Sequence, residues 1–365
     1  MSIAQGTLAF MAAPGTLEYA TYDVPVAGPG ALVMRVTRAN VCGSELHIWN
    51  GKHPTKRRGG IGHEMVGVVE SLGDGTTVDN TGAPLAIGDR IVVPYFQTCE
   101  HCFHCLRGEW NLCDNAYEFY GMQPEEWPHF HTSYATHYYV HPRQYVYKVP
   151  AAIPDSVAAG ANCALSQVLF GIASAGFANG ETLLVQGAGG LGLYATAIAD
   201  QLGITTIVVD GVAARLEQAK KFGADHVINI ADVPDAEERR QRILHLTDGR
   251  GPDGAIEVTG VPAAFSEGLS LLRRGGQYLV MGNLSPGVTV PYDPGFVTRK
   301  ALKILHVDRY EPRYLKKALT FIENNLDNYP FEDLIDATFA LSEIEEALNA
   351  SAERRVTRAS IAISS

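Results

Sequence analysis

The sequence predicts an α/β protein of two domains, one rich in β-strands and one with a doubly wound parallel sheet. Two observations predict the division. The 365 residues exceed the length of one ordinary domain, and the pattern of predicted strands and helices changes near Pro154. Up to about residue 150, short β-rich runs at 32–38, 65–72 and 90–94 lie between Gly and Pro residues, with little helical periodicity.

Beyond Pro154 the pattern becomes an alternation of strands and helices, introduced by an apolar stretch at 162–172 that predicts a helix. Alternating elements of these lengths indicate parallel βαβ units. The predicted strands are 182–186, 205–210, 226–230, 253–258 and 277–281, and the predicted helices between them are 191–202, 213–222, 235–246 and 263–272. The tail returns to mixed content, with a strand at 302–307 and helices at 312–325 and 342–349.

Composition and charge exclude several classes of function. Apolar residues make up 46% of the chain, enough to bury a sizeable core. The formal net charge of -11 opposes binding to nucleic acid or to anionic membranes, which need basic patches. Residues 1–14 have no basic start before their apolar stretch, and no apolar run reaches the roughly eighteen residues of a membrane span. We therefore expect a cytoplasmic protein with neither nucleic acid nor membrane as a partner.

Four of the six cysteines lie in one short segment with the spacing C-x2-C-x2-C-x7-C, namely Cys99, Cys102, Cys105 and Cys113. In a reducing compartment such a cluster indicates a metal rather than disulfides. Four thiolates on one loop match a closed tetrahedral zinc site, with an iron–sulfur cluster as the alternative. His101 and His104 lie inside this loop, and we interpret them as solvated residues rather than further ligands.

A glycine-rich turn follows the predicted strand 182–186 and opens the next helix: Gly187, Gly189, Gly190, Leu191 and Gly192. Strand before and helix after are the context that makes G-x-G-x-x-G a dinucleotide-binding fingerprint in a Rossmann domain. The glycines permit a tight turn and a close approach of pyrophosphate, and the helix N-terminus supplies N–H groups for its phosphates. The next predicted strand ends at Asp210, whose carboxylate suits the ribose diol of NAD and would repel the extra phosphate of NADP.

A third signal is scattered along the chain. Cys42 precedes a segment that resembles a helix start, with Ser44 as a plausible cap, and His47 follows one turn later. His63 and Glu64 form a pair further on, and Cys163 lies in the apolar stretch before the glycine-rich turn. Taken singly, each of these cysteines and His63 would more often be a buried, inert residue.

Taken together, these residues and motifs resemble the zinc-containing alcohol dehydrogenases of the medium-chain dehydrogenase/reductase superfamily. The resemblance spans essentially the whole chain in the same order. It implies a GroES-like catalytic domain, residues 1–162 with a zinc lobe at about 95–115, completed by residues 303–365. The Rossmann domain between them would comprise residues 163–302, with the active site in the cleft.

The resemblance also implies two zinc ions per chain and the roles of particular residues. Cys42, His63 and Cys163 would hold the catalytic zinc and leave one position open, and the four clustered cysteines would hold a structural zinc. Glu64 stands where the family has a glutamate beside the metal. Glu45 stands where the family usually has an aspartate that orients the histidine ligand.

Ser44 and His47 match the family's proton relay, which runs from the alcohol through Ser44 and the nicotinamide ribose to His47 while hydride moves to NAD. Arg215 would lie near the adenosine, and Arg358 would contact the pyrophosphate; either could instead be a solvated surface charge. Trp49 and Tyr95 fall near positions that line the cleft. Aromatic residues between 117 and 139 are interpreted mostly as packing, with a few above a bulky apolar substrate.

The implied activity is reversible oxidation of an alcohol, secondary or bulky and cyclic, to its carbonyl compound by a homodimer or homotetramer. A polyol or sugar dehydrogenase is the alternative within the superfamily, although such relatives commonly have Glu in place of Cys163. A zinc-free quinone reductase-like or non-catalytic protein would lack the cysteine lobe and the Cys and His ligands. A nucleic-acid-binding zinc module is opposed by the acidic pI of about 5.5.

Overall fold

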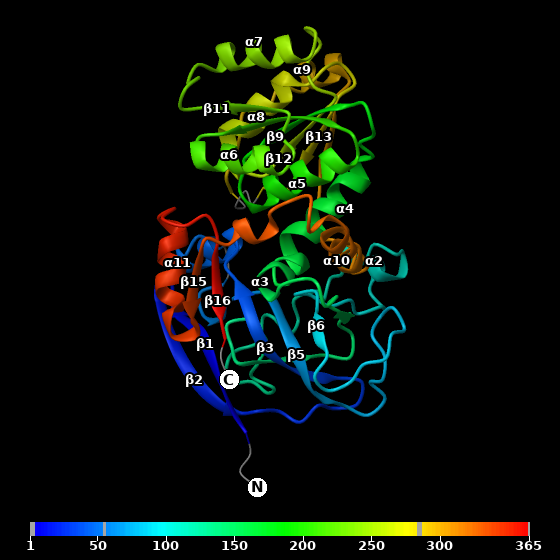
Figure 1. Ribbon diagram of the computed structural model, residues 1–365, viewed down its shortest axis with the longest axis vertical. Helices are drawn as coiled ribbons and strands as arrows, with labels where there is room; N and C mark the ends of the chain where they lie inside the picture. The colour runs from blue at the N-terminus through cyan, green and yellow to red at the C-terminus, as the bar shows by residue number, and fades with distance from the viewer. Residues whose placement is uncertain (1–3, 54–55, 283–286, 364–365) are drawn as a thin grey trace. The chain divides into compact units, whose positions relative to one another are not determined.

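A computed structural model describes residues 4–53, 56–282 and 287–363, in which the chain divides into two compact units (Figure 1). The first unit comprises residues 1–166, 311–326 and 331–365, and the second comprises residues 167–310 and 327–330. Cys163 therefore belongs to the first unit. The C-terminal return, expected from residue 303, begins later because the strand Lys303–His306 pairs with the parallel sheet of the second unit.

The first unit contains two sheets. A three-stranded antiparallel sheet has the order β2-β1-β4, and a seven-stranded sheet runs β15-β16-β3-β5-β6-β8 with β7 paired to β3. Their strands are β1 Gln5–Ala13, β2 Thr16–Asp23, β3 Leu32–Asn40, β4 Gly59–Gly60, β5 Glu64–Leu72, β6 Arg90–Val92, β7 His137–Val140, β8 Tyr147–Lys148, β15 Ala337–Ala340 and β16 Ala359–Ala362.

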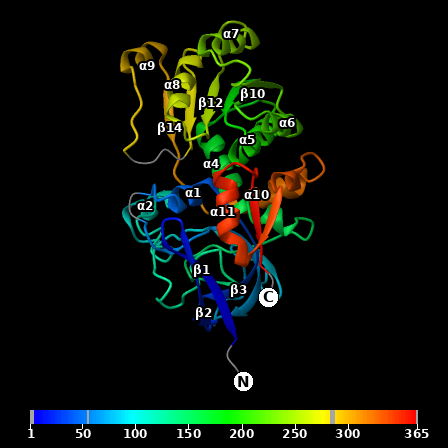
Figure 2. The ribbon, with the colours of Figure 1, turned by 90° about the vertical axis from the view of Figure 1, so that its left-hand side faces the viewer.

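Helices complete the first unit: α1 Gly43–Trp49, α2 Phe103–Leu106, α3 Asp155–Ala158, α10 Tyr314–Asn325 and α11 Ile344–Ala352, with 3-10 turns at Trp110–Leu112, Phe331–Leu334 and Leu341–Glu343. The last strand, β16, pairs antiparallel with β3 near the start of the chain. Helix α11 packs against β16 (Figure 2), and its Ile344 and Leu348 join the apolar core between helix and sheet. The two ends of the sequence thus build one core.

The second unit is a six-stranded, wholly parallel sheet with the order β11-β10-β9-β12-β13-β14. Strand order reverses beside β9, as in Rossmann domains, and the crevice at that reversal is where such sheets bind dinucleotides. Its strands are β9 Thr182–Gln186, β10 Thr205–Asp210, β11 His226–Asn229, β12 Gly254–Glu257, β13 Gln277–Val280 and β14 Lys303–His306, and its helices are α4 Ser166–Ala175, α5 Gly190–Gln201, α6 Ala213–Lys221, α7 Ala236–Leu246, α8 Pro262–Leu271 and α9 Pro294–Lys300.

Three local expectations differ from the structure. The helix expected at 162–172 is two elements, because a π-helix, Ala161–Leu165, precedes α4. Ser44 does not cap α1, since the helix begins at Gly43 and its N-cap is Cys42. The stretch Asp155–Ala175 has the length and apolar composition of a membrane span, but 72% of its most apolar window is buried inside the protein, as in the core helix of a folded domain.

Candidate functional site

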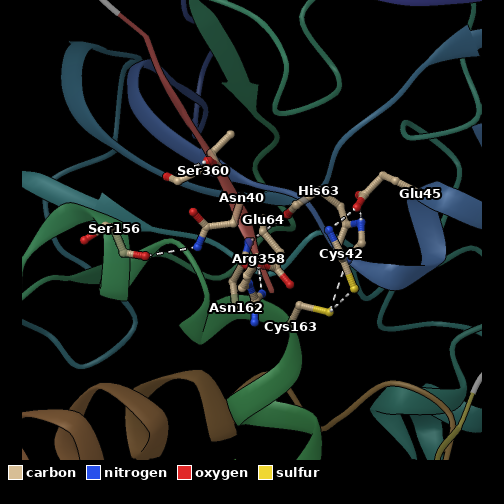
Figure 3. Close-up of polar contacts among 11 residues, drawn as sticks. Asn40, Cys42, Glu45, His63, Glu64, Ser156, Asn162, Cys163, Arg358 and Ser360 are labelled. Atoms are coloured by element: carbon tan, nitrogen blue, oxygen red, sulfur yellow. Dashed lines mark hydrogen bonds and ion pairs between the residues drawn. The ribbon is translucent and has the colours of Figure 1, made fainter. Parts of the chain in front are cut away.

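Three segments of the first unit bring together Cys42, His63, Glu64 and Cys163 (Figure 3). Cys42 stands between β3 and α1, His63 directly precedes β5, Glu64 begins β5, and Cys163 lies in the π-helix. One ligand atom from each lies within 4.8 Å of the others. Segments more than a hundred residues apart therefore converge on one point, where three of the four residues are buried.

The spacing of these atoms fits a tetrahedral zinc ion. The sulfurs of Cys42 and Cys163 are 3.9 Å apart, and two sulfurs about 2.3 Å from one zinc ion lie about 3.8 Å apart at the tetrahedral angle. His63 Nε2 is 3.2 Å from the Cys163 sulfur, slightly shorter than the roughly 3.6 Å of a zinc-bound pair. Three neutral or thiolate donors leave a fourth position open, which a catalytic zinc requires.

Glu45, the residue that replaces the family's usual aspartate, reaches the site in spite of its longer side chain. It is fully buried in α1, and its carboxylate forms an ion pair with His63 Nδ1. Its other oxygen accepts a hydrogen bond of 2.6 Å from the backbone N–H of Cys42. One carboxylate thus orients two ligands, and its contact with Nδ1 leaves Nε2 of His63 to face the sulfurs.

Asn162 fixes the π-helix that carries Cys163. Its Nδ2 donates to the carbonyl oxygen of His63 at 2.9 Å and to that of Val93 at 3.0 Å, so it joins the turn to two neighbouring segments. π-Helical turns are rare and occur mostly at functional sites. The sequence offers only the position of Asn162 beside Cys163 as a signal for this role.

Arg358 lies in the same cluster, although the resemblance places it at the pyrophosphate. Its guanidinium, in the segment before β16, forms an ion pair with Glu64, and both side chains are buried (Figure 3). Burial raises the pKa of Glu64 to about 7, against the lowering effect of Arg358. A contact between Arg358 and phosphate remains a prediction, because one Nη atom of its guanidinium pairs with Glu64.

The two thiols of the cluster differ in acidity. The hydrogen bond with Cys163, together with His63, holds the pKa of Cys42 well below its ordinary value, while the same hydrogen bond and burial raise the pKa of Cys163. Of this pair, Cys42 is therefore the more acidic thiol. Metal binding needs both thiolates and would release the protons that they carry.

The four clustered cysteines form a second, separate group whose sulfurs all lie within 4.8 Å of one another. Backbone N–H groups point at these sulfurs: Cys99 donates to Cys113 at 3.3 Å and Cys102 donates to Cys99 at 3.3 Å. Burial acts to raise the pKa of Cys99, but the N–H groups of His101 and Cys102 lower it to about 6. All six cysteines are free of disulfides, so the lobe offers four ligands.

The two histidines of this lobe have other partners. His101 Nδ1 lies 2.6 Å from the carbonyl oxygen of Cys99, and His104 Nδ1 lies 2.9 Å from the Glu109 carboxylate. Neither belongs to the group of converging ligand atoms.

Ser44 and His47 both lie on α1, and each is partly buried. The Nδ1 atom of His47 is buried and has no hydrogen-bond partner in the described part of the chain. Burial, reinforced by Lys52, lowers the pKa of His47, so its ring is neutral at pH 7 and able to accept a proton.

In the second unit the glycine-rich turn has the geometry that a dinucleotide needs. Gly187 adopts φ 104°, and a Cβ on Gly192 would lie 1.8 Å from the Gly187 carbonyl oxygen, so helix and strand approach closely. A Cβ on Gly189 would meet only open space, which leaves room for a phosphate at the N-terminus of α5. Gly190 and Leu191 form the first turn of that helix.

Asp210 ends β10 and faces this turn. One carboxylate oxygen accepts a hydrogen bond of 2.7 Å from the Ala188 N–H, and the other accepts one of 2.8 Å from the Val212 N–H. Asp210 therefore also holds the glycine-rich turn against β10. Arg215 lies in the first turn of α6, two residues beyond its start, and is partly buried.

The aromatic residues separate into core and site. Trp49 is 3% exposed and its Nε1 donates to Asn349, so it packs in the core of the first unit and does not line a cleft. The core also takes Phe130, Tyr134, Tyr138 and Tyr139, as expected for packing residues. Tyr95 instead stands edge-on to His63 at 4.7 Å between ring centroids.

Comparison with known proteins gives the family. The family model "Alcohol dehydrogenase GroES-like domain" matches residues 28–151, and "Zinc-binding dehydrogenase" matches residues 190–324. The 5-exo-hydroxycamphor dehydrogenase of Pseudomonas putida is 32% identical over 334 residues, which cover 90% of this chain and 91% of that protein. Sorbitol dehydrogenase of Bacillus subtilis is 30% identical over 338 residues, 88% of this chain and 89% of its own.

A solved alcohol dehydrogenase from Thermotoga maritima superposes over 99% of this chain and 100% of its own, with a TM-score of 0.92 and 29% identity. Fold and comparisons thus define an oxidoreductase with a Rossmann domain and a GroES-like domain, as the sequence predicts. The chain belongs to the zinc-containing alcohol dehydrogenase family of the medium-chain dehydrogenase/reductase superfamily. An alcohol or polyol is the substrate class of such an oxidoreductase.

Proposed function

We propose that this protein is a zinc-dependent, NAD-linked dehydrogenase that reversibly oxidises a secondary or bulky, cyclic alcohol to its carbonyl compound. The observation that carries the proposal is the convergence of Cys42, His63 and Cys163 at zinc-ligand spacing, with Glu45 orienting the histidine. The relative from Pseudomonas putida acts, by its name, on a hydroxycamphor, which is a cyclic secondary alcohol.

Residues of both units would hold the cofactors. Cys42, His63 and Cys163 would hold the catalytic zinc with Glu64 beside it, and the cysteines of the 95–115 lobe would hold a second, structural zinc. The glycine-rich turn would bind the phosphates of NAD. When bound, zinc supplies a Lewis acid that lowers the pKa of the substrate hydroxyl, and NAD accepts the hydride.

The protein's own side chains would move the proton. Ser44 would accept it from the substrate hydroxyl, and His47 would act as the outer base, since its ring is neutral near pH 7. Asp210 would favour NAD by binding the ribose diol and repelling a phosphate. Arg215 and Arg358 remain candidates for contacts with the adenosine and pyrophosphate parts. We expect a cytoplasmic homodimer or homotetramer.

A second candidate, a polyol dehydrogenase, is favoured by the likeness to sorbitol dehydrogenase. Purified, zinc-replete protein should be assayed for NADH formation with cyclohexanol, benzyl alcohol, ethanol, sorbitol and L-threonine. We expect kcat/KM to be highest for the cyclic or aromatic alcohol and turnover to vanish in Cys163→Ala with the fold retained. A preference for sorbitol would favour the alternative, and turnover by Cys163→Ala would refute the proposed metal site.

A further inference from the structure

Three consecutive basic residues, Lys56, Arg57 and Arg58, precede β4, and their side chains differ in their hydrogen-bond partners. Arg57 donates to the carbonyl oxygens of Gly51 and His53, and Arg58 pairs with the Glu125 carboxylate. The Nζ atom of Lys56 is buried and has no hydrogen-bond partner among the residues described. Burying an ammonium without a hydrogen-bond acceptor is costly, which favours a ligand that brings an acceptor to it.

Lys56 lies at the end of a row of rings that starts at the metal-ligand group. His63 meets Tyr95 at 4.7 Å, Tyr95 stacks on Tyr117 at 6.4 Å, and Tyr117 meets Tyr120 at 6.1 Å, all between ring centroids. We call Tyr95, Tyr117 and Tyr120 the aromatic wall. The Lys56 ammonium stands 3.8 Å from the centroid of the Tyr120 ring.

The electrostatics of Lys56 agree with this placement. Burial lowers its pKa to about 7, against the raising effect of Glu45. In the part of the chain that the structure describes, no hydrogen bond or ion pair joins Lys56 to Glu45, whose carboxylate contacts His63 and the Cys42 N–H instead. The Tyr120 ring attracts the ammonium by a cation–π contact but supplies no negative charge. A carboxylate brought by a ligand would supply it.

We propose that Lys56 and the aromatic wall form a substrate subsite, which makes this enzyme selective for alcohols that carry a carboxylate on an apolar, ring-containing body. The body lies along the wall, of which Tyr117 is 43% exposed, and the Lys56 ammonium donates to the carboxylate. Lys56 is then a specificity-determining residue. The inference rests on the proposed dehydrogenase function and narrows its substrate class.

The test compares acids with neutral alcohols of matched size. The probes are 3- and 4-(hydroxymethyl)benzoate, each against the corresponding methylbenzyl alcohol, because the two positions sample the distance from the reacting hydroxyl to Lys56. The wild-type protein should have a kcat/KM about 10-fold or more higher for the better acid than for its neutral partner. Lys56→Met should lower kcat/KM for that acid about 10- to 100-fold, as expected for loss of a charge-assisted hydrogen bond, and change the neutral alcohol little.

Lys317→Met is the matched control, because Lys317 stands over the Tyr314 ring at the same 3.8 Å but is exposed. It should leave the acid-to-neutral ratio unchanged, and Lys56→Arg should keep most of it. Thermal unfolding checks that each variant is folded, and Lys56→Gln replaces Lys56→Met should the latter not fold.

Calorimetric titration of zinc-replete protein with benzoate gives a readout that does not need turnover. Binding should weaken about 10-fold or more in Lys56→Met and not in Lys317→Met. Equal kcat/KM for acids and neutral alcohols in the wild type, or benzoate binding insensitive to Lys56, would overturn the subsite. Absence of turnover with every alcohol would refute the proposed function instead, and the benzoate titration would still decide the subsite.

Discussion

Replacing Glu45 by Gln removes one negative charge from a fully buried position and leaves the size of the side chain nearly unchanged. The carboxylate now serves His63 Nδ1 and the Cys42 N–H together. A carboxamide can accept from only one of them through its oxygen, and its NH2 group would then face a donor. His63 and Cys42, two of the metal ligands, thus lose the carboxylate that contacts both of them.

The structure sets the size of this effect. Hydrogen bonds to a charged group contribute about 1.5–3 kcal/mol and neutral ones about 0.5–1.5 kcal/mol. The difference, about 1–1.5 kcal/mol for the His63 contact, corresponds to roughly a 10-fold change in affinity. Loss of the contact with the Cys42 N–H adds to this change. Zinc affinity at the Cys42–His63–Cys163 site should therefore fall about 10- to 100-fold, as is typical when a residue that orients metal ligands is replaced.

The assay is a competition titration of two-zinc protein with a chelator, in which the cysteine lobe serves as an internal reference. Glu109→Gln is the matched control, because that carboxylate also contacts a histidine Nδ1, 2.9 Å away on His104, outside the converging ligand atoms. Glu109→Gln should release both zinc ions as the wild type does. An unchanged affinity in Glu45→Gln would refute the positioning role.

Further predictions concern the remaining parts of the site. His47→Gln should slow alcohol oxidation about 10-fold or more near pH 7, and its rate should recover at high pH, where hydroxide replaces the base. In the wild type, kcat should rise with pH below the ordinary pKa of histidine, because the pKa of His47 is lowered. A parallel loss at every pH would contradict the relay. Asp210→Gly should shift the ratio of kcat/KM values from NAD toward NADP, and a wild-type enzyme that prefers NADP would show our interpretation of Asp210 to be wrong. Elemental analysis should find two zinc ions per chain, and a stoichiometry of one would contradict this expectation. Cys105→Ala should lower the melting temperature, because the lobe closes on its metal; an unchanged melting temperature would contradict a structural zinc in the lobe.

The alternation of strands and helices was sufficient to predict the parallel sheet, because strands buried on both faces form continuous apolar runs with helices between them. The strands of the first unit were harder to predict. In β1, Leu8 to Met11 is almost wholly buried, so its burial shows no two-residue alternation, and β15 and β16 are short strands whose pairing partners are distant in sequence.

The metal-ligand residues were predictable only as a set. Cys42, His63 and Cys163 have no local pattern in common, and the resemblance to a family grouped them before the structure brought them together. The roles of Asn162 and Arg358 could not be predicted, since a hydrogen bond to the His63 carbonyl and an ion pair with Glu64 depend on tertiary contacts. Lys56 gave no signal in the sequence for the same reason.

Because Cys163 lies in the π-helix Ala161–Leu165, the position of its sulfur depends on the number of residues in that turn as well as on their identity. An α-helix advances by about 100° per residue, so one residue more or fewer turns everything on one side of it by that angle. Removing one residue here would let the chain continue as an ordinary helix while Cys163 or Asn162 faced another direction. Such a shortened chain would still contain Cys42, His63 and Cys163, but these residues would no longer converge. The result would be a folded protein without the metal-binding geometry.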